Sequence, residues 1–166
     1  MKNLMIFLFL AASFLSAAQA SEIVPPSPNG IEFPKNYKDW RLVSTSHRLD
    51  NSTLRVIVGN DKAIEAVRSN NINPWPDGAI LGKMVWKEAT MLSWEKAVVP
   101  GEFVHVEFME KDSKKYPSTG GWGFARWKGM ELKPYGQNES FVFECFGCHT
   151  PVKESDYVFT HTSTMP

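Results

Sequence analysis

The chain has 166 residues, and its 18 basic and 18 acidic side chains give a formal net charge of +0. This length suits a single domain, and a neutral chain lacks the excess positive charge of proteins that bind nucleic acid or anionic membrane surfaces. The composition therefore predicts an ordinary globular domain with no nucleic-acid partner.

Residues 1–20 have the features of a secretory signal peptide. Lys2 supplies the positive charge at the start, residues 4–15 are almost entirely apolar, and Ala-Gln-Ala before Ser21 has the small residues of a cleavage site. The apolar run is too short to cross the ~30 Å hydrocarbon core of a bilayer as a stable helix. We therefore predict cleavage before Ser21 and export, with an uncleaved N-terminal anchor as the alternative. No other long apolar run follows, so we expect no membrane span in the mature chain.

The first half of the mature chain divides into short elements. Residues 21–33 are rich in proline and are expected to form an irregular lead-in. The elements predicted after it are a short helix at 34–40, strands at 42–47 and 53–58, and a helix at 61–69. Asn60 or Asp61 is the expected N-cap of the second helix. Residues 70–78 contain two prolines and an Asp-Gly pair and are expected to form a loop.

The second half is richer in strand patterns. We predict strands at 79–87, 91–99, 103–109 and 122–127, separated by turn residues such as Gly101. The chain ends with a cysteine-containing turn at 143–150 and a further segment at 152–159. These patterns indicate an α+β or mainly β domain, an antiparallel sheet with a few short helices, over residues 34–166.

Both cysteines of the chain lie in the sequence Cys-Phe-Gly-Cys-His at 145–149. C-x-x-C-H is the attachment signal for a c-type haem, in which Cys145 and Cys148 each form a thioether and His149 binds the iron from the proximal side. A redox-active C-x-x-C of the thioredoxin type normally follows a βαβ pattern, which this chain lacks, and a structural zinc site needs four ligands. The motif therefore predicts one covalently attached haem.

The late position of the motif bears on the sixth coordination position of the iron. A simple electron-transfer cytochrome commonly completes its coordination with a distal methionine. Met165 is the sole methionine after His149. The earlier candidates, whose ordinary role would be core packing, are Met84, Met91, Met109 and Met130. An iron bound by His149 alone would keep an open position for a small molecule.

Three charged residues in the predicted strands are candidates for the open side of the haem. Lys83 lies among apolar residues, which fits either a lysine directed at the haem, nucleophilic once desolvated, or the wetter face of a strand. Glu107 shares its predicted face with Phe103 and His105 and would accept protons from an iron-bound substrate. Arg55 would bind a haem ligand or a propionate, or form a surface pair.

Several segments of the mature chain together form a recognisable pattern. The first is Pro-Lys-Asn-Tyr-Lys-Asp-Trp at 34–40. The others lie at 53–56, 76–78, 107–114, 145–149 and 156–160. In order and spacing they resemble the cytochrome P460 family of periplasmic mono-haem proteins. The resemblance implies an antiparallel sheet, a five-coordinate haem, a periplasmic location and a homodimer.

The resemblance also implies roles for the charged residues. In catalytic members of the family a lysine amine is linked to a haem meso carbon, and the matching residue here is Lys83. Arg55 corresponds to an arginine in the pocket, and Glu107 corresponds to a distal carboxylate that assists proton removal. Those members oxidise hydroxylamine, with nitric oxide, to nitrous oxide or nitrite. We therefore expect a haem c oxidoreductase that passes its electrons to another periplasmic cytochrome.

Two other functions are compatible with the same residues. A related branch, cytochrome c′-beta, lacks the lysine link and binds nitric oxide under an aromatic cap, so a gas-binding protein without turnover is one alternative. Plain electron transfer is the other, and it requires a six-coordinate iron.

Overall fold

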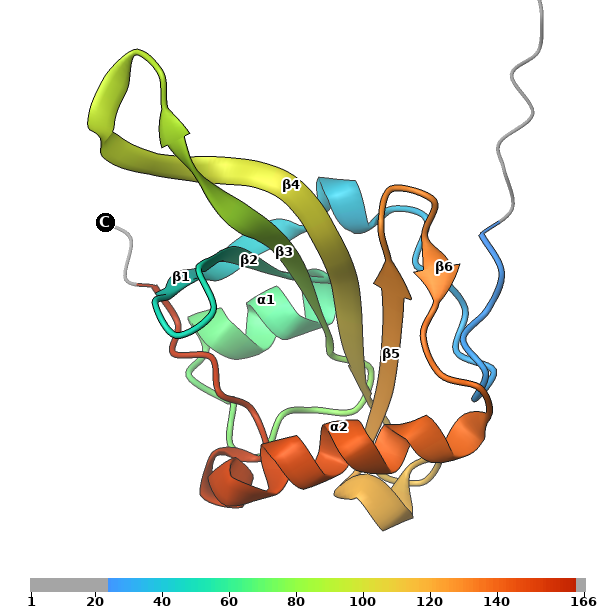
Figure 1. Cartoon of the computed structure of the whole chain (residues 1–166). Helices are drawn as coiled ribbons and strands as arrows, with labels where there is room; N and C mark the ends of the chain where they lie inside the picture. Colours follow the sequence, from blue (N-terminus) through green and yellow to red (C-terminus); the bar gives the residue numbers. More distant parts are fainter. Residues whose placement is uncertain (1–23, 164–166) are drawn as a thin grey trace, which may run out of the picture.

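The computed structural model describes residues 24–163, which form a six-stranded antiparallel sheet with helices packed against it (Figure 1). The predicted signal peptide and Met165 lie outside the described residues. The strands follow one another across the sheet in chain order, so each pairs with its neighbour in sequence. This arrangement confirms the prediction of a mainly β fold with a few short helices. None of the helices in the described part is both long and apolar enough to cross a membrane.

Local signals in the sequence account for the elements of the first half. Strands β1 (Arg41–Arg48) and β2 (Thr53–Gly59) pair as an antiparallel hairpin. Helix α1 (Asp61–Arg68) begins after Asn60, whose side-chain Oδ1 accepts hydrogen bonds from the backbone N–H groups of Ala63 and Ile80, both at 3.0 Å. The cap therefore satisfies a free N–H of the helix and ties the helix to the next strand. The predicted helix at 34–40 is a 3-10 helix of three residues, Tyr37–Asp39.

Strands β3 (Ile80–Met91) and β4 (Trp94–Lys111) form a long hairpin that extends beyond the rest of the sheet (Figure 1). The prediction of separate strands at 91–99 and 103–109 is wrong, because β4 runs without a break from Trp94 to Lys111 and Met91 is the last residue of β3. Pro100 lies opposite Glu88 where the pairing register shifts, so its missing N–H falls at an irregularity of the ladder. A Cβ on Gly101 would lie 3.0 Å from the Cβ of Ala89. These two residues mark a bulged region rather than the end of a strand.

The sheet is completed by β5 (Trp122–Lys128) and β6 (Lys133–Pro134), the second of which the sequence did not predict. Helix α2 (Val142–His149) follows and crosses one end of the sheet (Figure 1). It contains the cysteine motif, so the prediction of a short turn there is corrected to a regular helix. A 3-10 helix, Thr150–Ser155, leads from α2 into the C-terminal segment.

Both faces of the sheet are covered. On one face, Phe108 and Trp127 pack edge-to-face against Phe33 of the N-terminal segment. The opposite face, which we call the helical face, packs against α1 and α2 through a core of buried residues that includes Ile57, Ala63, Leu81 and Phe124. Cys145 and Phe146 of α2 pack against this core. Any functional group on the helical face therefore lies on the same side of the sheet as the cysteine motif.

Candidate functional site

The cysteine motif lies on α2 with its two thiols three residues apart, which places them on neighbouring positions of one helix face. Both cysteines are free, with Cys145 partly buried and Cys148 exposed. Burial raises the pKa of the Cys145 thiol. A redox-active C-x-x-C depends on a lowered thiol pKa, so this environment disfavours the thioredoxin-type alternative. In residues 24–163 no group of three or more His, Cys, Asp or Glu side chains is placed to hold a metal ion, so the zinc alternative gains no support.

The imidazole of His149 is held in one orientation. Its Nδ1 lies 2.6 Å from the carbonyl oxygen of Tyr157. Because a carbonyl only accepts, Nδ1 carries the proton and donates, which leaves the lone pair of Nε2 available to a metal. The ring also packs against Phe124 and Phe159, with centroid distances of 5.3 Å and 5.1 Å. Burial lowers the pKa of His149, which favours the neutral imidazole that binds iron.

A carboxylate surrounded by cations lies on the helical face. The register places Lys83 of β3, Glu107 of β4 and Arg126 of β5 directly opposite one another. The carboxylate Oε1 of Glu107 lies 2.5 Å from Nη2 of Arg126 and 3.1 Å from Nε2 of His105, and Oε2 contacts the amine of Lys83. We call these four residues the carboxylate cluster. Since the first three belong to three different strands, the cluster depends on the sheet register.

The electrostatics of the cluster keep Glu107 ionised. Its side chain is 16% exposed, and burial alone would raise the pKa of the carboxyl group. The hydrogen bond with His105 and the cations of Lys83 and Arg126 outweigh that effect and hold the pKa of Glu107 well below its usual range. At neutral pH the cluster therefore presents an ionised, largely desolvated carboxylate, and its lowered pKa makes it a weak base while all of these partners are in place.

Arg55 lies on the same face, beside the cluster. It pairs across the sheet with Val85, which lies opposite His105 on β4. Burial lowers the pKa of Arg55, with the neighbouring Arg48 acting in the same direction. Within the described part of the chain, the buried Nε atoms of Arg55 and Arg126 have no hydrogen-bond partner. These two Nε–H donors are therefore left without an acceptor among residues 24–163.

The motif helix and the carboxylate cluster lie close enough to interact electrostatically. The charges of Lys83, Glu107 and Arg126 all act on the ionisation of both Cys145 and His149. Lys83 lies between the buried Leu81 and Val85 on its strand face, and its side chain is 29% exposed, so it does not lie on a fully solvated face. The structure thus brings the six sequence-predicted site residues to one side of the sheet. These are Arg55, Lys83, Glu107, Cys145, Cys148 and His149.

Sequence reasoning did not identify Arg126 as part of the site. The available signal was a charged residue between Ala125 and Trp127, in a strand that is otherwise almost entirely buried.

The prediction that Phe103 shares a strand face with Glu107 is wrong. It lies on the face opposite Glu107 and packs against Trp86, because the β3–β4 register shifts after Val85.

The methionines proposed as distal ligands are dispersed over the structure. Met84 packs on the face opposite the cluster, and Met130 is exposed beside a turn. Met91 lies at the far end of the β3–β4 hairpin. Met109 shares the helical face with Glu107 and packs against the core there. Of these four, Met109 is therefore the one whose position is compatible with binding an iron near the cluster.

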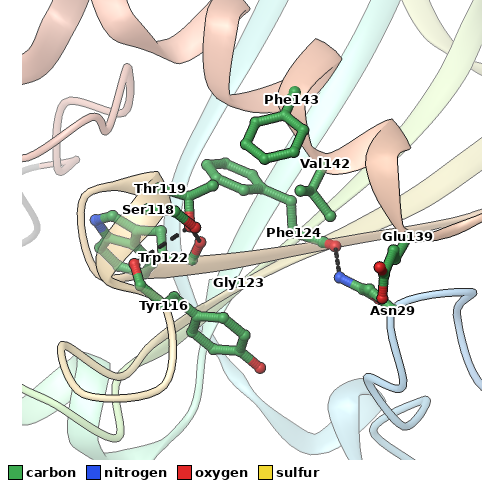
Figure 2. A pocket seen from close by; sticks show the side chains of 10 residues that line it. All are labelled: Asn29, Tyr116, Ser118, Thr119, Trp122, Gly123, Phe124, Glu139, Val142 and Phe143. Atoms are coloured by element: carbon green, nitrogen blue, oxygen red, sulfur yellow. Dashed lines mark hydrogen bonds between the residues drawn. The ribbon is translucent and has the colours of Figure 1, made fainter.

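A separate pocket of about 220 Å³ lies between the start of α2 and the beginning of β5 (Figure 2). Figure 2 shows Phe143 and Val142 of α2 above Phe124 of β5, with Tyr116 on the other side of the strand. None of the six predicted site residues lines this pocket. It is therefore distinct from the carboxylate cluster.

The residues of the helical face fit the haem that the motif predicts. Two free thiols lie on one helix face, and the adjacent histidine keeps its Nε2 lone pair available. Two buried guanidinium Nε atoms without partners in residues 24–163 suit the carboxylates of a haem or an anionic ligand of its iron. Cys145, Cys148 and His149 would hold the haem, and the carboxylate cluster would lie near it.

Comparison with known proteins agrees with this arrangement. The sequence profile of the cytochrome P460 family matches residues 34–160, which is most of the chain. The matched region includes the cysteine motif, Arg55 and the whole carboxylate cluster. No curated protein sequence matches the chain. With most of its length and its haem-attachment motif inside the match, the chain belongs to the cytochrome P460 family of haem cytochromes.

Proposed function

We propose that this protein is a periplasmic c-type cytochrome that oxidises hydroxylamine, with nitric oxide, at a single covalently attached haem. Cys145 and Cys148 would form the thioethers, and His149 would be the proximal ligand. The observation that carries the proposal is the ionised carboxylate of Glu107, held by three cationic or hydrogen-bonding partners on the face that α2 covers. Family membership accounts for the haem, and Glu107 is the proton acceptor that we assign to the oxidation once the Lys83 cation beside it has been removed.

The chemistry divides between the haem and the protein. When bound, the haem supplies an iron that holds a small nitrogen ligand and takes up electrons. Hydroxylamine releases protons as it is oxidised, and the carboxylate of Glu107 is the acceptor we assign to them. The Nε–H donors of Arg55 and Arg126, which have no partner in the described part of the chain, would orient the oxygen of the nitrogen species. The electrons would leave to an external periplasmic cytochrome.

We assign Lys83 to the haem cross-link found in catalytic members of the family. Its amine lies against the carboxylate of Glu107, on the same side of the sheet as the motif helix. An amine bonded to the haem ring no longer carries an ammonium charge, so Glu107 would lose one of the cations that depress its pKa. Formation of the cross-link would therefore raise the pKa of Glu107 and make it a stronger base.

Turnover by the purified holoprotein tests the proposal. The protein is mixed with hydroxylamine, with and without nitric oxide, and an artificial electron acceptor. We expect hydroxylamine-dependent reduction of the acceptor and release of nitrous oxide when nitric oxide is present. A holoprotein that binds no hydroxylamine, followed through its Soret band, and reduces no acceptor would contradict the proposal.

The two alternative functions give different spectra. A gas-binding protein needs an open iron position, and it needs neither Glu107 nor the cross-link. It would show an ordinary c-type ferrous Soret band and bind nitric oxide without turnover. An electron carrier would have a six-coordinate low-spin iron that does not respond to nitric oxide, with Met109 as the candidate ligand. A ferrous Soret maximum shifted far to the red would identify the cross-linked haem and favour the enzyme.

A homodimer is also part of the proposal. The tip of the β3–β4 hairpin exposes Leu92 and Trp94, with relative exposures of 99% and 66%, and Val98 nearby is also exposed. An exposed apolar group of this kind is typical of a surface that contacts another protein. Analytical ultracentrifugation of the holoprotein is expected to show a dimer that Trp94→Ser weakens. A monomer at all concentrations would contradict this part of the proposal.

A further inference from the structure

A buried ion pair joins β4 to the segment that follows the haem motif. Lys111, the last residue of β4, is 6% exposed, and Asp156 is 8% exposed. The amine of Lys111 lies 2.7 Å and 2.8 Å from the two carboxylate oxygens of Asp156 and 3.1 Å from the carbonyl oxygen of Gly120. All three N–H donors of the lysine therefore have an acceptor. A fully hydrogen-bonded pair of this kind holds its two segments in one relative position.

Two tryptophans strengthen the attachment of Asp156. The backbone N–H of Trp75 donates to its carboxylate Oδ2 at 2.8 Å. The indole Nε1–H of Trp122 donates to the backbone carbonyl of Asp156, also at 2.8 Å. Both tryptophans belong to the buried core of the helical face. The side chain and the main chain of Asp156 are thus fixed independently, by the loop before β3, by β4 and by β5.

This attachment continues directly to the proximal histidine. Asp156 and Tyr157 have φ angles of 50° and 64°, the left-handed region that residues with a Cβ rarely adopt. Such a conformation persists where surrounding contacts enforce it, and the contacts of Asp156 do so here. The result is that the carbonyl of Tyr157 lies 2.6 Å from Nδ1 of His149. The ring of Tyr157 packs over Gly120, where an added Cβ would clash with it.

We propose that Lys111 and Asp156 are positioning residues for the proximal ligand: they fix the Tyr157 carbonyl that orients His149 and sets the strength of its bond to iron. The proposal rests on the assignment of His149 as the proximal ligand. A strong hydrogen bond from Nδ1–H makes the imidazole a better electron donor, which strengthens the iron–nitrogen bond and lowers the reduction potential. Loosening the ion pair would weaken that hydrogen bond and reverse both effects.

The test uses variants of the holoprotein that differ in whether a charge is left buried. Lys111→Met leaves the Asp156 carboxylate without its main partner, and this change is expected to impair folding. The double variant Lys111→Met with Asp156→Asn removes both charges and approximately keeps the sizes of the two side chains. The matched control is Lys115→Met, which removes the exposed ion pair of Lys115 with Glu110 near the same end of the sheet.

Two readouts report on the proximal bond without using turnover. Resonance Raman spectroscopy of the ferrous protein gives the iron–histidine stretching band, and a redox titration gives the reduction potential. We expect the double variant to shift the band to lower frequency and to raise the potential, and the control to leave both unchanged. A folded double variant with the wild-type band and potential would show that the pair merely stabilises the fold, and would overturn the inference.

A second variant covers the case in which the double variant does not fold. Trp122→Phe keeps an aromatic ring and both charges of the ion pair, and it removes the indole N–H that donates to the backbone carbonyl of Asp156. We expect the same downward shift of the iron–histidine band, and an unchanged band would count against the inference. If wild-type protein shows no iron–histidine band at all, then either the iron is six-coordinate or His149 is not its ligand, and the proposed function fails instead. The two failures are therefore distinguishable.

Discussion

Glu107 and Arg126 lie directly opposite each other on β4 and β5, with 2.5 Å between the carboxylate Oε1 and the guanidinium Nη2. Lys83 lies opposite Glu107 on its other side, on β3. The carboxylate is therefore held between two cations on a partly covered face. This arrangement keeps it ionised and places it toward α2, and both properties have measurable consequences.

Replacing Glu107 is expected to separate binding from turnover. Glu107→Gln keeps the size of the side chain and removes its capacity to accept a proton. We expect hydroxylamine turnover to fall by about 10²–10⁴-fold, because that is the usual contribution of a positioned acid–base group. Nitric oxide binding is expected to persist. Glu102→Gln, at an exposed position of the same strand, is the matched control. Wild-type turnover in Glu107→Gln would contradict the assigned role.

The same substitution carries a stability prediction with a definite sign. The folded-state pKa of Glu107 lies below its ordinary value of about 4.3, so its interactions stabilise the protein above that pH. This contribution is lost as the pH falls through the folded-state pKa. Urea unfolding at about pH 7 is therefore expected to find Glu107→Gln less stable by about 1–3 kcal/mol, because Lys83 and Arg126 lose their partner. The difference should narrow below about pH 4. A pH-independent difference would contradict the ion-pair explanation.

Arg126 is expected to influence the pH dependence of turnover. Arg126→Gln removes a cation beside Glu107, which raises the pKa of that carboxyl group. The acid limb of the pH–rate profile should consequently move to higher pH. Lys128→Gln is the control, since Lys128 also lies over the ring of Tyr135 and has no contact with Glu107. Equal effects of the two substitutions would argue against a specific pairing of Arg126 with Glu107.

The cross-link can be tested by mass. After chemical cleavage of the thioethers, wild-type protein is expected to retain the mass of the haem, and Lys83→Leu is expected to lose it. Lys87→Leu, four residues along the same strand, is the control at an exposed position. The red-shifted ferrous Soret band should disappear in Lys83→Leu alone. Release of haem from wild-type protein under these conditions would show that Lys83 is not linked.

The N-cap of α1 gives a prediction that is independent of the haem. Asn60→Ala removes the acceptor for the N–H groups of both Ala63 and Ile80. We expect a loss of about 1–2 kcal/mol in the free energy of unfolding, measured by denaturant titration. Asn60→Asp keeps an oxygen acceptor and is expected to retain most of that stability. An unchanged stability in Asn60→Ala would show that water replaces the cap.

The sequence alone was informative where the determining interactions are local. The α1 cap, the β1–β2 hairpin and the spacing of the C-x-x-C-H motif all depend on residues within a few positions of one another. Alternation also indicated correctly that Lys83 shares a face with Leu81 and Val85. The alternation of side chains along the strand gave the wrong face for Phe103, because a register shift in the β3–β4 pairing moves that residue to the other face of the sheet.

By itself, the sequence determined the haem motif, the mainly β fold and the identities of Arg55, Lys83 and Glu107 as candidates, because side-chain period and motif spacing are properties of a single segment. Tertiary structure alone decided that Arg126 joins Glu107 and that Asp156 pairs with Lys111, 45 residues earlier. Such partners come from separate segments, and their pairing depends on the register of the strands and on the burial that makes each charge require a counter-charge.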